Sequence, residues 1–292
     1  MEFCKEVIVK LPSIHMNPKV RDIVLRALKE DVGSGDITTG SLVPKGRKVQ
    51  AVILTREDCT VSGAKVAASV FGLLDKTVRC RILIPDGRVA KKGQVIVELR
   101  GNASSILTAE RTALNIMQRM CGISTQTAGF VKAVVRYGTK ILDTRKTTPN
   151  MRILEKYAVV CGGGTNHRLG LYDMVLIKDN HRALRGGGSL ADLVSLARKK
   201  AHGRSIEAEV ENVQELMDVL KSRPDWVMLD NMSPSLMKTC VALCRGICKT
   251  EASGGITMKN IMQTARTGVD AISLGCLTHS VRSIDLSLEI EL

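Results

Sequence analysis

The second half of the chain alternates short apolar runs with segments long enough to form helices, and this alternation limits the fold more than any other feature. Repeated β-α units of this kind build a parallel sheet, which is either doubly wound or closed into a barrel. Between the runs lie amphipathic stretches with helical spacing, such as 190–200, 213–220 and 235–243. The predicted strands are residues 140–142, 174–177, 206–210, 227–229, 248–250 and 271–274.

The first part of the chain predicts a separate mixed α/β domain. Apolar and polar residues alternate over 78–84, which indicates a half-buried strand, and 95–99 would pair back with it as a hairpin. The same alternation returns over 284–292, and we expect this tail to join the sheet of the first domain. The predicted division is therefore an N-terminal domain of residues 1–112, to which 281–292 returns, and a second domain of residues 113–280.

The charge of the chain points to a negatively charged partner. Lysine and arginine number 43 against 29 aspartate and glutamate, which gives a formal net charge of +14. The partner could be a polymer, a membrane or a small anion. Aromatic residues make up 2% of the chain, whereas single-strand nucleic-acid binders need aromatic side chains for base stacking. The composition therefore argues against nucleic-acid binding.

Targeting signals and disulfides are not indicated. The apolar runs are strand-sized, far below the ~20 residues of a membrane span, and the N-terminus lacks an apolar signal core. We expect a cytoplasmic protein without a membrane partner, in which the nine scattered cysteines are reduced. On a helix, Cys240, Cys244 and Cys248 would share one face, which favours small buried side chains and leaves a metal site as the alternative.

Polar or glycine residues follow all six predicted strands. In a β/α barrel these positions lie at one rim, where side chains from different strands converge on one ligand. Cations follow the early strands and carboxylates follow the later ones, an order that ordinary turns do not require. The residues are Asp143, Arg145 and Lys146, then Lys178, Asp179 and Asn180, then Glu211, Asp230, Glu251 and Gly275.

Two late glycine elements suit a phosphate group. Ser253, Gly254 and Gly255 lead toward a helix predicted to begin near Thr257, and Gly275 opens a second short loop. Glycine lets a phosphate oxygen approach backbone amides, and a helix N-terminus adds a positive end. In barrels, the loops after the last two strands often bind phosphate.

The cations and carboxylates at the strand ends suit an anionic ligand with a metal or a sugar. Arginine forks fit carboxylate and phosphate, while lysine acts as a mobile point charge. Two carboxylates that face a phosphate ligand usually indicate Mg²⁺ held partly through water, or hydrogen bonds to sugar hydroxyls; a structural pairing with nearby lysines is the alternative. The cationic set is Arg145, Lys146, Arg168 and Lys178, with His167 beside it, and the carboxylates are Glu211 and Asp230.

Eight segments, in order and nearly end to end, resemble the quinolinate phosphoribosyltransferase family, also called nicotinate-nucleotide pyrophosphorylase (carboxylating). They are residues 33–39, 110–115, 143–149, 162–168, 176–181, 209–211, 229–231 and 251–257. The resemblance implies an α/β protein with an open-faced N-terminal α/β sandwich and an incomplete TIM-like barrel. It also implies the conversion of quinolinate and phosphoribosyl pyrophosphate, with Mg²⁺, into nicotinate mononucleotide, pyrophosphate and CO₂ in de novo NAD biosynthesis.

The resemblance further implies a homodimer, or a higher oligomer, whose active sites are shared between subunits. Arg111 of the partner subunit would reach the site. The residues implied for quinolinate are Arg145, His167 and Arg168, and those implied to neutralise the substrates are Lys146 and Lys178. Glu211 and Asp230 would serve the ribose hydroxyls and the Mg²⁺-pyrophosphate. The residues implied for the 5′-phosphate are Ser253, Gly254, Gly275 and His279.

Two departures and two alternatives accompany this resemblance. Asn150 replaces the usual glycine, and asparagine also tolerates left-handed backbone. Residues 182–188 are unlike the family and are expected to form a mobile loop near the barrel mouth. A related phosphoribosyltransferase or molybdate-operon paralogue that uses another base is one alternative. A basic nucleic-acid-binding protein is the other, which the few aromatics disfavour.

Overall fold

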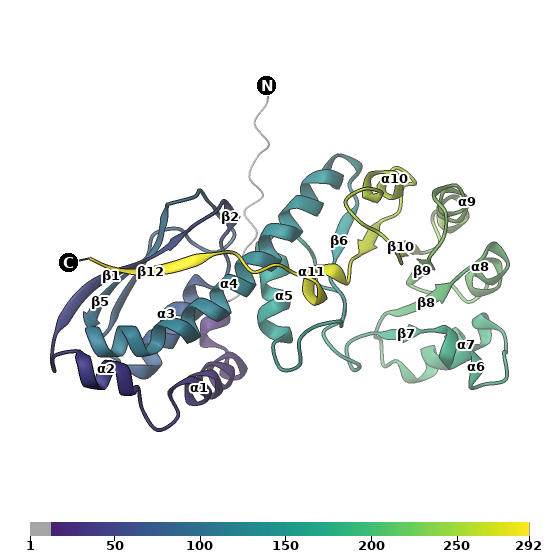
Figure 1. Cartoon of the computed structure of the whole chain (residues 1–292). Coiled ribbons are helices and arrows are strands. Elements are labelled where there is room, and N and C mark those ends of the chain that lie inside the picture. The colour runs from purple at the N-terminus through teal and green to yellow at the C-terminus, as the bar shows by residue number, and fades with distance from the viewer. Residues whose placement is uncertain (1–12, 292) are drawn as a thin grey trace. The chain divides into compact units, whose positions relative to one another are not determined.

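The computed structural model describes residues 13–291, which divide into two compact units (Figure 1). The first unit contains the chain up to Ala128, Thr147–Gly163 and the chain from Leu277 onward. The second unit contains Gly129–Lys146 and Gly164–Cys276. This division differs from the one predicted at residue 112, because helix α4 runs without interruption through that position, from Ala103 to Val134.

The first unit is built on an antiparallel four-stranded sheet. Its strands, in spatial order, are β12 (Leu286–Glu291), β1 (Lys48–Thr55), β5 (Val95–Asn102) and β3 (Arg79–Ile82), and β2 (Cys59–Thr60) pairs separately with β4 (Val89–Ala90). The register of β12 on β1 places Ile290 opposite Ala51, so the predicted return of the C-terminal tail is confirmed. Leu292, the last residue of the predicted strand, lies outside the described residues.

Helices pack on this sheet and complete the predicted α/β sandwich. Figure 1 shows α2 and α3 on one face of the sheet. The helices of the first unit, besides most of α4, are η1 (Ile14–Met16), α1 (Pro18–Val32), α2 (Ile37–Leu42), α3 (Ala64–Leu74) and α5 (Arg152–Cys161). Asn17 caps α1 by accepting a hydrogen bond from the Lys19 N–H at 2.9 Å, and Pro18 occupies the first helical position, where its missing donor has no cost.

The second unit is a parallel six-stranded sheet, as the alternation of apolar runs predicts. Its strands, in spatial order, are β6 (Lys140–Leu142), β11 (Ala271–Ser273), β10 (Lys249–Ser253), β9 (Trp226–Asp230), β8 (Ile206–Val210) and β7 (Val175–Ile177). The edge strands β6 and β7 leave the barrel incomplete. The central strands are buried on both faces, with Ala208, Val227 and Ala252 fully enclosed, as covered parallel sheets require.

Helices cover the outside of the parallel sheet (Figure 1). The helical elements that follow α5 or link the strands are η2 (Val135–Tyr137), α6 (Asp179–Ala183), α7 (Leu190–Lys200), α8 (Val213–Leu220), α9 (Pro234–Cys244), α10 (Ile261–Ala265) and α11 (Cys276–His279). Three of them start at a polar cap: the side chains of Ser189, Asn212 and Ser233 each accept a hydrogen bond from a first-turn N–H.

Several local predictions need adjustment. The helix expected near Thr257 begins only at Ile261, because Asn260 accepts the Thr257 N–H at 2.7 Å and closes a turn first. Part of 182–188 belongs to α6 rather than to an irregular loop. Asn150 has φ 66°, which confirms that it takes the left-handed backbone expected of it.

The structure also shows where the predicted cysteine face lies and what lengths of apolar helix the described residues form. Cys240 and Cys244 are buried on α9, in agreement with the interpretation as small core side chains, whereas Cys248 follows the end of that helix. Burial raises the pKa of the Cys240 thiol. Within residues 13–291, none of the helices combines the length and the apolar character needed to cross a bilayer.

Candidate active site

The site predicted at the strand ends lies within the second unit. Because its six strands are parallel, their carboxyl ends share one edge, and the residues that follow them come together there. Arg145 and Lys146 follow β6, Lys178 follows β7, and Glu211 follows β8. Asp230 and Ser253 are the last residues of β9 and β10, and Gly275 follows β11. The structure thus gathers these residues from all six strands.

Three glutamates stand at alternate positions along β8 and directly after it: Glu207 and Glu209 lie in the strand, and Glu211 follows its last residue. Alternation places all three on the same face of the sheet. Their exposure rises toward the carboxyl end of the strand: Glu207 is buried, Glu209 is half-buried and Glu211 is exposed. One face of one strand therefore carries a buried carboxylate, a carboxylate in the site and a carboxylate at the rim.

The middle glutamate is paired with a predicted site cation. The Nζ of Lys178 lies 3.2 Å from Oε2 of Glu209. Burial raises the pKa of the Glu209 carboxyl, the Lys178 ammonium lowers it, and the nearby charges of Asp230 and Asp179 raise it. The ion pair keeps Glu209 in a small group of interacting charges at the end of β7 and β8.

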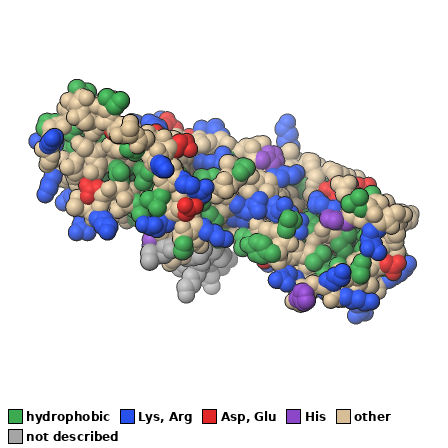
Figure 2. Space-filling view, turned by 90° about the horizontal axis from the view of Figure 1, so that it is seen from below, with side chains coloured by type: hydrophobic (Ala, Val, Ile, Leu, Met, Phe, Trp, Pro, Cys, Tyr) green, Lys and Arg blue, Asp and Glu red, His purple; other side chains and the backbone are tan. Residues whose placement is uncertain are grey.

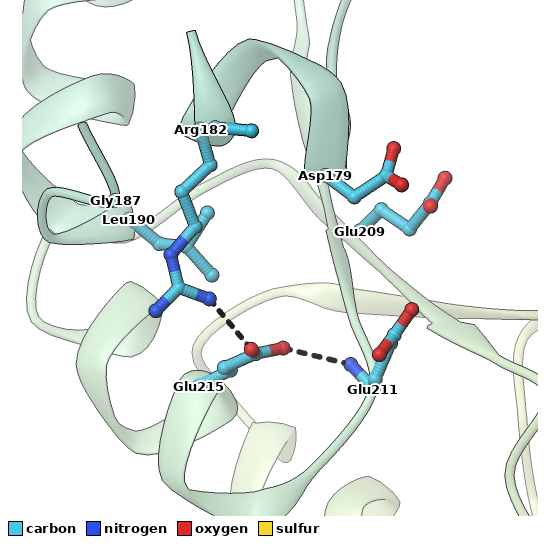
Figure 3. Close-up of a pocket in the computed structure, with 8 residues that line it drawn as sticks. Asp179, Arg182, Gly187, Leu190, Glu209, Glu211 and Glu215 are labelled. Atoms are coloured by element: carbon cyan, nitrogen blue, oxygen red, sulfur yellow. Dashed lines mark hydrogen bonds and ion pairs between the residues drawn. The ribbon is translucent and has the colours of Figure 1, made fainter. Parts of the chain in front are cut away.

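A cavity of about 330 Å³ opens beside this pair (Figure 3). Figure 3 shows the carboxylates of Asp179, Glu209 and Glu211 on the same side of it. On the other side, Arg182 is ion-paired with Oε1 of Glu215 at 2.6 Å, and Oε2 of Glu215 accepts the backbone N–H of Glu211 at 3.0 Å. Helix α6 is therefore linked to the end of β8 through Glu215.

His167 lies deeper and contacts two buried carboxylates. Its Nε2 is 3.1 Å from Oε2 of Glu207 and 3.4 Å from Oε2 of Glu251, and its side chain is 9% exposed. The His167 backbone N–H donates to Oδ1 of Asp143 at 2.9 Å, and its Nδ1 accepts the backbone N–H of Arg168 at 2.7 Å. Both ring nitrogens of this predicted quinolinate ligand thus have partners within the chain.

Arg168 and Arg145 form the cationic part of the site. Arg168 is held by a hydrogen bond from Nη1 to the Met174 carbonyl at 3.1 Å. Burial and the charge of Arg145 lower the pKa of Arg168, and the charge of Glu207 raises it. Two half-buried guanidinium groups close enough to perturb one another suit an anionic ligand with more than one negative oxygen group.

The glycine loop after β10 is tightly packed. Gly254 has φ +89°, and a Cβ there would lie 2.1 Å from Oδ1 of Asn231. The Asn231 side-chain amide donates to Oδ2 of Asp230 at 2.7 Å, and its backbone N–H donates to the Ser253 carbonyl at 2.9 Å. Gly254 is therefore needed both for its backbone conformation and for the position of Asn231 against Asp230.

Two predicted site residues, Arg111 and His279, belong to the first unit. Arg111 lies on α4 and its side chain is 59% exposed, with Nη2 3.9 Å from Oε1 of Glu110. His279 ends α11, is exposed and shares a 2.6 Å hydrogen bond between Nδ1 and the hydroxyl of Ser280.

Sequence reasoning missed Glu207 and gave Glu209 no role. The signal was present in the alternation of Glu207, Glu209 and Glu211, since every second residue of a strand shares a face. Because the prediction rested on polar residues that follow an apolar run, it included only Glu211, the last of the three glutamates. Elsewhere on the surface, Figure 2 shows Lys and Arg side chains spread over both parts of one face, in keeping with a solvated basic exterior.

Comparison with known proteins gives consistent matches over nearly the whole chain. The family model described as quinolinate phosphoribosyl transferase, N-terminal domain, matches residues 36–121, and the model for the C-terminal domain matches residues 123–289. A probable nicotinate-nucleotide pyrophosphorylase [carboxylating] of Bacillus subtilis is 42% identical over 264 residues, which cover 90% of each chain.

A plant relative and a solved structure agree with these matches. A quinolinate phosphoribosyltransferase [decarboxylating] 1 of Nicotiana glauca is 37% identical over 304 residues, covering 98% of this chain and 86% of the relative. The structure of the nicotinate-nucleotide pyrophosphorylase from Francisella tularensis superposes with a TM-score of 0.90 at 41% identity, covering 96% of this chain and 99% of the other.

Proposed function

Because the chain belongs to the quinolinate phosphoribosyltransferase family, we propose that the strand-end residues of its second unit form the site of the family's reaction. The chain transfers the phosphoribosyl group of phosphoribosyl pyrophosphate to quinolinate, with loss of CO₂. The products are nicotinate mononucleotide and pyrophosphate, in NAD biosynthesis. Both substrates are anionic, which agrees with the concentration of cations at the strand ends.

The proposed site is carried by the placement of the half-buried Arg145 and Arg168, which follow β6 and precede β7 beside the enclosed His167 ring. Quinolinate has two adjacent carboxylates on a pyridine ring, and each guanidinium can bind one of them through two parallel hydrogen bonds. In the absence of an anion, two neighbouring guanidiniums repel one another, as the lowered pKa of Arg168 reflects. A dicarboxylate ligand removes that repulsion, so the arrangement favours a doubly charged substrate over a singly charged one.

Lys178, Lys146 and the carboxylates of β8 and β9 would act on the sugar. Departure of pyrophosphate leaves positive charge on the ribose carbon, and preorganised carboxylates stabilise such charge while lysines neutralise the leaving group. The paired Glu209 and Lys178 offer both charges at one edge of the sheet. Positioning the pyridine nitrogen near that carbon lowers the barrier further.

A magnesium ion fits the carboxylates of Glu211 and Asp230. Glu211 follows β8 and Asp230 ends β9, and these two strands are parallel neighbours. Mg²⁺ prefers hard oxygen ligands such as carboxylates, usually together with water and phosphate oxygens. When bound, the ion would supply positive charge to the pyrophosphate. Glu211 is exposed and Asp230 half-buried, so both can hold the ion through water while the Asn231 amide fixes the Asp230 carboxylate.

The phosphate of the ribose would lie on the loops after β10 and β11. Backbone amides of Gly254 and Gly275 and the Ser253 hydroxyl can approach phosphate oxygens there. The family resemblance also implies His279 for this phosphate. We place Arg111 of the partner subunit at the quinolinate end, which makes the functional assembly a homodimer or a multiple of it.

One assay tests the reaction and a second tests the shared site. Purified protein with quinolinate, phosphoribosyl pyrophosphate and Mg²⁺ should release CO₂ and nicotinate mononucleotide in equal amounts. The variants Arg111→Ala and Arg145→Ala should each be inactive and regain part of the activity when mixed. Absence of product from folded protein would disprove the reaction. Failure to regain activity after verified subunit exchange would disprove the shared site alone.

A further inference from the structure

Three ionisable side chains meet in the interior of the second unit, behind the strand-end residues. His167, Glu207 and Glu251 come from the loop before β7, from β8 and from β10. Both glutamates are 1% exposed, and their Oε2 atoms lie 3.1 and 3.4 Å from the same ring nitrogen of His167. The other carboxylate oxygens, Oε1 of Glu207 and Oε1 of Glu251, are buried without a hydrogen-bond partner. Buried carboxylates in this arrangement need a function, since their burial costs stability.

The hydrogen bonds of His167 show how the cluster positions the residues next to it. Because Nδ1 of His167 accepts the Arg168 backbone N–H, Nε2 carries a proton toward the two carboxylates. The backbone N–H of His167 is held in turn by Asp143, which is fully buried. The ring of His167 is therefore held through Nδ1 and Nε2, and the residue is held a third time through its backbone N–H. Arg168 follows it directly in the chain, so the position of that guanidinium depends on the ring.

The cluster also holds one shared proton and one net negative charge. Burial and the neighbouring Glu251 raise the pKa of Glu207 to about 7. The two carboxylates outweigh burial and raise the pKa of His167 to about 10. While Nδ1 accepts the Arg168 N–H, the ring is a neutral imidazole, and one carboxylate with one carboxylic acid gives a net charge of minus one. An imidazolium with two carboxylates has the same net charge but gives up that hydrogen bond, because both of its ring nitrogens are donors. Either form places a buried negative charge next to Arg168.

We propose that Glu207 and Glu251 are positioning residues for the quinolinate site, acting through His167 and Arg168. They hold the ring that precedes Arg168, and their single negative charge offsets the repulsion between Arg168 and Arg145 before substrate binds. The inference rests on the proposed assignment of these arginines to quinolinate. It gives His167 a supporting role, since both of its ring nitrogens already have partners in the chain.

A metal ion is the competing occupant of a histidine and two carboxylates. Their ligand atoms lie within 4.8 Å of one another, which would suit a divalent cation. The neighbouring guanidinium of Arg168 opposes a cation at this point, and its charge acts directly on Glu207. The hydrogen-bond distance between Nε2 and Glu207 is also that of a shared proton. The structure therefore favours the proton.

Steady-state kinetics of Glu207→Gln and Glu251→Gln test the proposal. Glutamine keeps the shape and removes the charge. Each variant should raise the KM for quinolinate at least ~10-fold, as misplacement of a binding group does, and leave the KM for phosphoribosyl pyrophosphate within about twofold. The double variant should fall short of the product of the two effects, because the residues act on one ring. The control is Glu98→Gln, a half-buried residue on β5 of the first unit that pairs with Arg81, with wild-type constants expected.

The pH profile separates positioning from general loss of structure. In the wild type, the KM for quinolinate should change between about pH 6 and 8, where Glu207 titrates, and this change should be absent in Glu207→Gln. Variants that stay folded with an unchanged or lower KM for quinolinate, or with both KM values raised equally, would overturn the proposal. Retention of one Zn²⁺ per chain in the wild type, lost in Glu251→Gln, would overturn it as well. A wild-type enzyme without turnover would instead disprove the proposed function.

Discussion

The ammonium of Lys178 lies 3.2 Å from the carboxylate of Glu209, across the adjacent strands β7 and β8. This pair joins a cation predicted from the sequence to a carboxylate that the sequence had left without a role. Glu211, two residues further on and just past the end of β8, is exposed and donates its backbone N–H to Glu215. Of these two glutamates, the half-buried Glu209 is thus the one that contacts a predicted cation of the site.

Loss of the Glu209 charge should reduce catalysis strongly. Glu209→Gln removes the counterion of Lys178 and a carboxylate preorganised near the ribose, so we expect kcat to fall ~10²-fold or more. Glu211→Gln should lower kcat less and should chiefly shift the Mg²⁺ concentration needed for half-maximal rate. Initial rates at saturating substrates over a range of Mg²⁺ concentrations measure both effects. A larger loss of kcat in Glu211→Gln than in Glu209→Gln would contradict this assignment.

The parallel sheet could be predicted because short runs rich in apolar residues alternate with segments of helical periodicity. The position of strand ends relative to one another then follows from parallel pairing alone. The role of Glu207 could not be predicted in this way. It interrupts an apolar run between Ile206 and Ala208, and its partner Glu251 is far away in sequence on β10. Only the adjacency of strands in space brings both carboxylates to His167.

Local turn chemistry explains the smaller differences. The sequence after Gly255 predicts a helix near Thr257, but an Asn260 side chain can close a turn on the Thr257 N–H and delay the helix. Helix α4 runs through residue 112, where the sequence predicts a domain boundary, and continues to Val134 because nothing in that stretch ends a helix. Both differences depend on side-chain hydrogen bonds or packing, which the spacing of apolar residues does not report.

Gly254 should not tolerate a side chain. The Cβ of Gly254→Ala would lie 2.1 Å from Asn231 Oδ1 on a backbone with φ +89°, so Asn231 must move and release Asp230. We expect a loss of ~1–3 kcal/mol in the free energy of unfolding and a higher KM for phosphoribosyl pyrophosphate. Gly72→Ala is the matched control, since Gly72 lies in α3 with nothing within 4 Å of the new Cβ. Equal unfolding free energies and KM values for the two variants would contradict the prediction.

Glu155 should contribute strongly to the stability of the first unit. Its side chain is 1% exposed, lies 2.7 Å from Nη2 of Arg119 and accepts the Thr148 N–H at 3.2 Å. Glu155→Ala leaves Arg119 without its buried partner and should cost ~3–5 kcal/mol. The exposed pair of Arg26 and Asp22, 2.9 Å apart, gives the control: Asp22→Ala should cost less than ~1 kcal/mol. Urea unfolding of both variants measures the difference, and equal costs would contradict the role assigned to burial.

The cluster of His167, Glu207 and Glu251 should make stability fall as pH rises. The folded-state pKa of Glu207, about 7, lies above its ordinary 4.5, and that of His167, about 10, lies above its ordinary 6.5. On unfolding, both groups release protons that the fold retains. The stabilisation is complete below the ordinary values and is lost from about pH 4.5 to 7 for Glu207 and from 6.5 to 10 for His167.

Because these groups share a proton, the cluster should contribute a slope of at most ~1.4 kcal/mol per pH unit to the free energy of unfolding. The charge of Glu251 raises the pKa of Glu207 and the charge of Arg168 lowers it, so these neighbours shift the midpoint of Glu207 rather than add to the slope. In Glu207→Gln, His167 loses a negatively charged acceptor, so its pKa returns toward its ordinary value. Denaturant unfolding at pH 7, 8 and 9 should therefore give a shallower decline in the variant than in the wild type. Parallel declines in the two proteins would show that the cluster retains no such proton.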